Sequence, residues 1–211
     1  MRNYDPPSQT TNLAAERYKA EGIRIVAIGD AQHDRATDWA KFQYPFHILV
    51  KNVDDLVTKV IGQCLQLQAR MQSLVIIGHG SPGHQQIGYA GDLEGGEILS
   101  IDTLVGAHWE KTFQRRKRVY QKHGPGKHRE SMSRLIPFFM PGAEVILGGC
   151  DVGEEPEVAR GLAQLLHVKV VAYSAQQVIP FNSVWVGKET AMGPGGALQQ
   201  SVTSNLPFHV R

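Results

Sequence analysis

The chain has 211 residues, of which 42% are hydrophobic and 20% are charged, and its formal net charge is +2. This length predicts a single domain with one substantial core, and the composition is that of an ordinary soluble globular protein. The small net charge points to no particular partner, and no apolar run approaches the roughly 18 to 20 residues that a membrane-spanning helix needs.

Neither the cysteine pattern nor the N-terminal residues indicate disulfides, a metal site or a cleaved signal. Cys64 and Cys150 are too few for a disulfide framework, and no Cys or His pair has zinc-finger spacing. Residues 1–7 are polar and contain no apolar signal segment. We therefore expect no metal, no cofactor and a cytoplasmic location by default, with signal-independent export left open. The pattern leaves the oligomeric state open.

The first half of the chain alternates helical and extended patterns. These patterns predict an N-terminal arm and helix (1–22), a strand (23–28) and a loop rich in aromatic residues (31–46). An extended segment (47–53), a long helix (54–71) and a second strand (74–77) follow. Asp54 is expected to be the N-cap of the long helix. Cys64 falls on the apolar face of that helix, where a cysteine is inert.

The second half of the chain repeats the alternation. It predicts a hairpin (81–89), a helix (103–120) and a second helix interrupted by Pro137 (131–139). A strand (144–147), a helix (154–167) and a further strand (168–173) follow. Pro141-Gly142 is expected to turn the chain into the strand at 144. Trp185 is assigned to an edge strand, and residues 188–211 are expected to form a tail with little pattern. The alternation predicts an α/β fold, a three-layer α/β/α sandwich with a mostly parallel central sheet.

Two short apolar runs each end in glycine and are followed by a side chain that can take part in catalysis, a histidine in one case and a cysteine in the other. Leu74 to Ile77 is followed by Gly78-His79-Gly80, and Val145 to Leu147 is followed by Gly148-Gly149-Cys150. Both runs are too short for a typical helix and rich in β-branched residues, which is typical of central strands. If the strands lie side by side and parallel, His79 and Cys150 emerge at the same carboxyl edge, where open α/β sheets place their sites.

A basic cluster is the one strongly biased segment of the chain. It begins with Arg115, Arg116, Lys117 and Arg118 and continues to Arg129. A solvated face is the favoured interpretation of such a cluster. Docking to nucleic acid or to an anionic surface is a weaker alternative, because few aromatic residues are interleaved with the charges. A loop open to cleavage, including self-cleavage at Arg115 to Arg118, is a third.

The order of the motifs resembles the caspase and gingipain superfamily of cysteine peptidases. The closer resemblance is to a bacterial caspase-like domain of unknown function found in large adhesins. It rests on His79-Gly80-Ser81-Pro82-Gly83, on Gln86-Ile87-Gly88, and on Pro141-Gly142-Ala143 leading to Gly149-Cys150-Asp151. The resemblance covers roughly residues 70–187. It implies a caspase-like domain over 23–187 with a basic insert at about 109–131.

The resemblance also implies roles for individual residues and a peptide or protein substrate. Cys150 would attack a peptide carbonyl, and His79 would protonate the leaving amine. The backbone amides of Gly80 and Cys150 would stabilise the oxyanion. Asp151 would line a pocket for a basic P1 residue, although capping of its loop is an equal alternative, and Ser174 and Gln176 would lie at the pocket wall.

Other functions remain open at this point. The basic insert is longer than the family pattern and no attached adhesin is expected, so we also expect that the chain could be a stand-alone, autoprocessing or effector protease. A class I glutaminase requires glycine where Val152 stands and a histidine after the nucleophile, where only His167 and His209 occur. No G-x-S-x-G motif of a serine hydrolase is present. A catalytically silent caspase-like module that binds through the basic insert is the main alternative.

Overall fold

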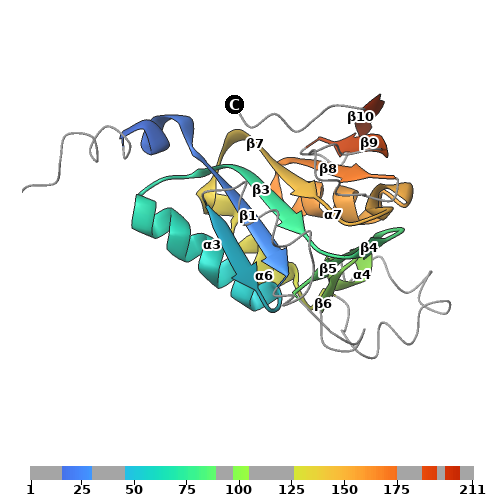
Figure 1. The fold of residues 1–211 in the computed structure, drawn as a ribbon, viewed down its shortest axis with the longest axis horizontal. Helices are drawn as coiled ribbons and strands as arrows, with labels where there is room; N and C mark the ends of the chain where they lie inside the picture. Colours follow the sequence, from blue (N-terminus) through green and yellow to red (C-terminus); the bar gives the residue numbers. More distant parts are fainter. Residues whose placement is uncertain are drawn as a thin grey trace, which may run out of the picture.

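A computed structural model of the chain describes residues 16–29, 46–88, 97–104, 126–174, 187–193 and 198–204. A seven-stranded sheet with the order β10-β9-β8-β7-β3-β1-β2 forms its centre (Figure 1). The strands are β1 Ile23–Gly29, β2 His47–Val50, β3 Met71–Ile77, β7 Phe139–Leu147, β8 Lys169–Tyr173, β9 Gly187–Met192 and β10 Leu198–Ser204. A smaller sheet contains β4 Gly80–Ser81, β5 His84–Ile87 and β6 Glu97–Leu99.

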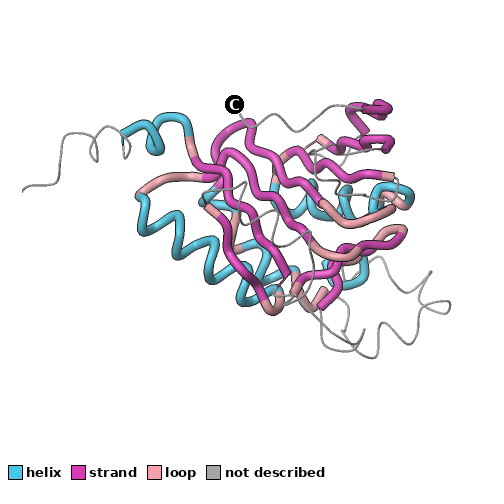
Figure 2. The backbone as a smooth tube through the Cα atoms, in the orientation of Figure 1, coloured by secondary structure: helices cyan, strands magenta, loops and turns pink. Residues whose placement is uncertain are grey.

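Helical segments connect the parallel strands. They are α3 Val53–Leu67, α4 Ile101–Leu104, α6 Arg129–Ser133 and α7 Glu157–Leu166, with short 3-10 helices η3 Ile136–Phe138 and η4 Val152–Glu154. The crossovers from β2 to β3, from β3 to β7 and from β7 to β8 all move in the same direction across the sheet. Because such crossovers are almost always right-handed, α3, α6 and α7 lie on the same face of the sheet (Figure 2).

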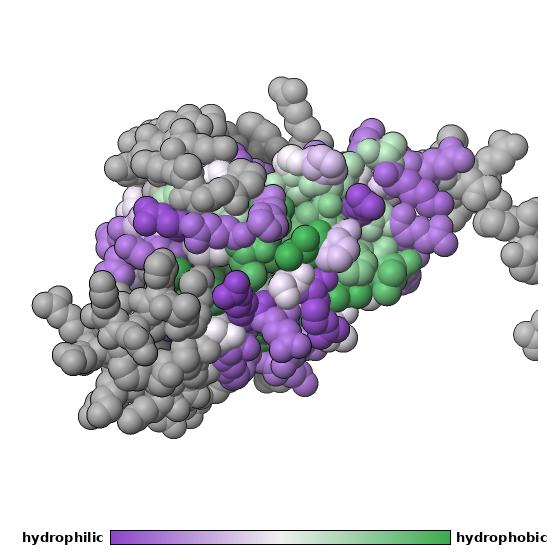
Figure 3. All heavy atoms as spheres, turned by 180° about the vertical axis from the view of Figure 1, so that it is seen from behind, coloured by the Kyte–Doolittle hydropathy of each residue, from purple (hydrophilic) through white to green (hydrophobic). Residues whose placement is uncertain are grey.

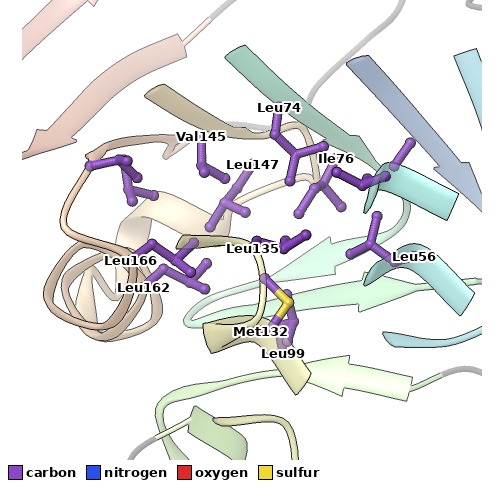
Figure 4. Packing of buried hydrophobic residues seen from close by; sticks show 14 of the residues in the cluster. Leu56, Leu74, Ile76, Leu99, Met132, Leu135, Val145, Leu147, Leu162 and Leu166 are labelled. Atoms are coloured by element: carbon purple, nitrogen blue, oxygen red, sulfur yellow. The ribbon is translucent and has the colours of Figure 1, made fainter. Parts of the chain in front are cut away.

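Alternate side chains of the central strands enter two separate cores. In β3, Leu74 and Ile76 join the core beneath the helices, whereas Val75 and Ile77 join a second core on the opposite face. Figure 4 shows Leu74 and Ile76 in the first core, with Leu162 and Leu166 of α7 packed against it. Burial on both faces is the reason for the continuous apolar runs in the sequence.

These observations confirm the predicted α/β class with a mostly parallel central sheet. β1, β2, β3, β7 and β8 pair in parallel, and only β9 and β10 at one edge are antiparallel. Burial of both faces is what a three-layer α/β/α sandwich requires. Within the described ranges no helix is long and apolar enough to cross a membrane. Seen from behind, hydrophobic residues gather between hydrophilic borders (Figure 3).

Several predicted boundaries in the first half of the chain are wrong by a few residues. Asn52, not Asp54, caps α3, because its side chain accepts a hydrogen bond from Asp55 N at 2.8 Å. Asp54 and Asp55 instead fill the first turn, where acidic groups complement the helix dipole. The helix ends at Leu67 because Gln68 adopts a left-handed conformation with φ of 49°. β3 can therefore begin at Met71, earlier than predicted.

The second half of the chain requires larger corrections. Pro141-Gly142 lies inside β7 and marks an irregular register against β3, so it does not turn the chain into that strand. The helix predicted over 131–139 is instead α6 followed by η3, which leads directly into β7. β9 and β10 extend the sheet where the sequence indicated a tail with little pattern. Of the helix predicted over 103–120, only α4 lies in the described residues, and Trp185 and the aromatic loop up to residue 45 lie outside them.

Glu97 ties the small sheet to two other segments. Its carboxylate accepts hydrogen bonds from Val53 N–H at 2.9 Å and from Lys127 Nζ at 2.6 Å, and His128 Nδ1 lies 4.0 Å away. Burial alone would raise the pKa of Glu97, but the hydrogen bonds from Lys127 and Val53 and the nearby cations outweigh burial and lower that pKa. The ionised carboxylate therefore stabilises the fold.

We predict that Glu97→Gln lowers the free energy of unfolding at pH 7 by about 1 kcal/mol, the scale of a partly exposed charged hydrogen bond. The lowered pKa means that this stabilisation is present above the unfolded value of about 4.3 and is lost as the pH falls through the folded value. Urea titrations of both proteins at pH 7 and pH 3 measure the difference. Glu21→Gln, in an exposed ion pair with Arg17, is the control. A difference that persists unchanged at pH 3 would contradict the assignment.

Candidate functional site

The histidine and cysteine predicted to act together follow the ends of neighbouring parallel strands. β3 pairs with β7 from Leu74↔Val145 to Ile76↔Leu147, and Gly148 N–H extends the ladder by donating to Ile76 O at 2.8 Å. His79 and Cys150 therefore emerge at the same edge of the sheet, and the predicted pairing of the two strands is confirmed.

The hairpin formed by β4 and β5 lies directly across the ends of three strands. At each strand end a glycine permits the contact, because an added Cβ atom would come within 3 Å of the hairpin backbone. The distances from such a Cβ atom are 2.9 Å at Gly29 to Gly88 O, 2.5 Å at Gly78 to Gln86 O and 2.9 Å at Gly149 to Gly80 Cα. Side chains larger than hydrogen are excluded at these three positions, which explains why each is a glycine.

The turn that carries His79 packs against the loop that carries Cys150. A Cβ atom added at Gly80 would lie 2.5 Å from Cys150 O and 2.5 Å from Val152 Cγ2. Gly83 N–H, at the far end of the turn, donates to Val152 O at 3.3 Å. The two loops are thus in direct backbone contact at both ends of the His79-to-Gly83 motif.

The two cysteines differ in their exposure to solvent, and Cys150 is the more exposed of the two. Cys150 is half-buried and its neighbour His79 is exposed to solvent, so a ligand can approach both. Cys64 is only 2% exposed, in the core beneath α3, as predicted. Burial raises the pKa of the Cys64 thiol to about 11, so its reactive thiolate is scarce at neutral pH.

We predict that iodoacetamide at pH 8 alkylates Cys150 at least about 100-fold faster than Cys64, because Cys64 is inaccessible and protonated. Peptide mass mapping of the quenched protein over time measures both rates. Alkylation in denaturant supplies the control, where the two rates should become similar. Equal rates in the folded protein would contradict the placement of Cys64 in the core.

The hairpin ladder leaves the amide of Gly80 directed away from β5. Gln86 N–H donates to His79 O at 2.9 Å, so these residues form a hydrogen-bonded pair. Antiparallel ladders alternate, and the next pair, Gly80 with Gln85, is therefore a non-hydrogen-bonded one. The Gly80 amide is not used by the hairpin and is directed away from its partner strand.

Gln85 is a site residue that the sequence interpretation missed. Its fully buried side chain accepts a hydrogen bond from Gly149 N–H at 2.9 Å and donates to Gln86 O at 3.0 Å. One signal could have revealed it. Residues 85 and 87 share a face of β5, and Ile87 indicates that this face is buried, so Gln85 is a polar side chain on an inward face.

The predicted substrate-binding residues lie at the same edge, as far as they are described. Asp151 follows Cys150 directly, is half-buried and has a left-handed φ of 57°. Ser174 follows the end of β8, the strand next to β7, and is half-buried. A Cβ atom at Gly153 would lie 2.9 Å from the backbone of Tyr173, so the Cys150 loop packs against that strand end. Gln176 lies outside the described residues.

Other predicted features are only partly visible. Arg115, Arg116, Lys117 and Arg118 lie outside the described residues, while Lys127 beyond them is exposed and paired with Glu97. No group of three or more His, Cys, Asp or Glu side chains suited to a metal occurs in the described part of the chain.

Comparisons with known protein families, curated proteins and solved structures find no match for this chain. The resemblance to caspase-like domains remains a prediction.

The close approach of the hairpin predicts a strong effect of one methyl group. We predict that Gly88→Ala lowers the free energy of unfolding by about 3 kcal/mol or more, since its φ is +80° and its Cβ atom would lie 1.9 Å from Lys51 O. Gly62→Ala is the control, because no atom lies within 4 Å of a Cβ atom there. Alanine in the helix interior should raise the free energy of unfolding by at most about 1 kcal/mol. Thermal unfolding measures both, and equal stability of the two variants would refute the packing.

Proposed function

We propose that the chain is a cysteine endopeptidase of the caspase-like type, with Cys150 as nucleophile and His79 as its acid–base partner. The observation that carries the proposal is the backbone contact between Gly80 and Cys150, which joins a histidine and a half-buried thiol at the ends of adjacent parallel strands. The order of the His and Cys motifs along the chain, which resembles that superfamily, supports it further.

The chemistry proceeds in two steps. The Cys150 thiolate attacks the carbonyl carbon of a peptide bond, and the bond to the amide nitrogen breaks as His79 donates a proton to the leaving amine. The product is a thioester between Cys150 and the N-terminal part of the substrate. Water then attacks the thioester with His79 as base, which releases the carboxylic acid and regenerates the thiol.

Two backbone amides stabilise the negative oxygen that forms in each step. The Gly80 amide is directed away from β5, and the Gly149 amide is already bound by Gln85. The donors in this proposal are the amides of Gly80 and Cys150, the pair that the resemblance to caspase-like peptidases implies. Donors of this kind contribute about 3 to 4 kcal/mol each to transition-state stabilisation.

The residues around Cys150 favour a basic side chain at P1. Asp151 is half-buried beside the nucleophile, and Glu154 and Glu155 follow in the same loop. Ser174 provides a hydroxyl at the neighbouring strand end. Negative charge at this position attracts Arg or Lys, whose charged hydrogen bonds to a carboxylate are stronger than neutral ones.

The proposal is tested by labelling with two peptidyl electrophiles, one bearing Arg and one bearing Asp at P1. We predict an adduct on Cys150 with the Arg probe, at least about tenfold slower labelling by the Asp probe, and loss of labelling in Cys150→Ala. His79→Ala should lower peptide turnover by about 100-fold or more, the scale of a lost general acid. Intact mass and peptide mapping identify the adduct.

Cys64→Ala is the matched control and should label like the unmodified protein, because Cys64 lies in the core. Failure of every probe to label Cys150, with peptide substrates also left uncleaved, would argue for a silent binding module instead of a peptidase.

A further inference from the structure

Gln85 occupies a slot between the strand ends that precede His79 and Cys150. The side chain is fully buried, with 0% of its surface exposed. A Cβ atom at Gly78 would lie 3.3 Å from its Nε2 atom, and one at Gly149 would lie 2.8 Å from its Oε1 atom. The two glycines thus leave the space that the carboxamide fills.

The carboxamide binds the backbone on both sides of this slot. Its Oε1 atom accepts from Gly149 N–H at 2.9 Å, while Nε2 donates to Gln86 O at 3.0 Å and, more weakly, to His79 O at 3.5 Å. An amide N–H can only donate and a carbonyl can only accept, so the positions of oxygen and nitrogen are fixed by their partners. A side chain here must therefore both donate and accept.

We propose that Gln85 is a positioning residue that holds the Gly148–Gly149 peptide unit, just before Cys150, in register with the His79 turn. This inference rests on the proposed peptidase function. Gly149 follows the last ladder hydrogen bond between β3 and β7, made by Gly148, so the sheet no longer fixes its amide. Gln85 supplies that constraint immediately before Cys150.

Replacement by an apolar side chain removes both functions of the carboxamide. Gln85→Leu is of similar size but leaves Gly149 N–H and Gln86 O without this partner. We expect kcat to fall about 100-fold, since small misplacements of reacting groups cost this much. KM should change little because Gln85 is fully buried and does not touch substrate. Exchange of the Gly149 amide hydrogen should also become faster.

Replacement by glutamate gives a readout that a purely structural role would not move. Gln85→Glu keeps an acceptor for Gly149 N–H, but when ionised it places a negative oxygen against the carbonyl oxygens of Gln86 and His79. Protonation restores a donor, and burial raises the pKa of such a carboxyl by several units. The ratio of kcat for Gln85→Glu to kcat for the unmodified protein should therefore rise at least about tenfold between pH 8 and pH 5.5.

Two controls accompany these variants in peptide-cleavage assays over that pH range. Gln66→Glu introduces the same charge on the exposed surface of α3, away from the carboxyl edge of the sheet, and should show a constant ratio. Val60→Ala, in the core beneath α3, lowers the melting temperature without touching the site and should also show a constant ratio. If Gln85→Leu does not fold, the pH dependence of the kcat ratio for Gln85→Glu is by itself the test.

The results of these assays distinguish the positioning role of Gln85 from the proposed peptidase function. Cys150-dependent cleavage by the unmodified protein, with a pH-independent Gln85→Glu ratio and an undiminished kcat in Gln85→Leu, would overturn the role of Gln85 alone. No Cys150-dependent cleavage by the unmodified protein would overturn the proposed peptidase and this inference with it.

Discussion

The arrangement of the candidate site depends on one packing constraint, the contact of a short hairpin with the ends of three parallel strands. Glycine at the end of each strand allows backbone to lie on backbone, at distances that any side chain would prevent. The hairpin in turn carries the His79 turn onto the Cys150 loop. Geometry that depends on backbone contact is rigid, and this rigidity suits a site in which reacting groups must be held in place before substrate arrives.

The sheet and the cores explain why this edge is available. Three successive right-handed crossovers move in one direction, which stacks β3, β7 and β8 beside one another and places their carboxyl ends in a row. Buried side chains on both faces fix the register of these strands. His79, Cys150 and Ser174 follow consecutive strands of this row, so the fold itself supplies three neighbouring positions for chemistry.

Much of this arrangement could be predicted from the sequence, because short β-branched runs closed by glycine specify central parallel strands. The pairing of the His79 and Cys150 strands followed from that pattern. Features that depend on tertiary contacts could not be predicted from the sequence. The left-handed Gln68 ends α3 without a glycine signal. β9 forms by pairing with β8, and β10 by pairing with β9, although their sequences show little period. Gln85 was hidden because a glutamine usually indicates a surface, and only its alternation with Ile87 indicates otherwise.

The most direct test of the central claim is a crystal structure of the protein treated with a peptidyl aldehyde bearing Arg at P1. The account predicts a hemithioacetal on Cys150 whose oxygen lies within about 3 Å of the backbone nitrogens of Gly80 and Cys150, with His79 on the side of the leaving group. An adduct whose oxygen points to solvent, or a Cys150 that stays unmodified while the aldehyde binds elsewhere, would contradict it.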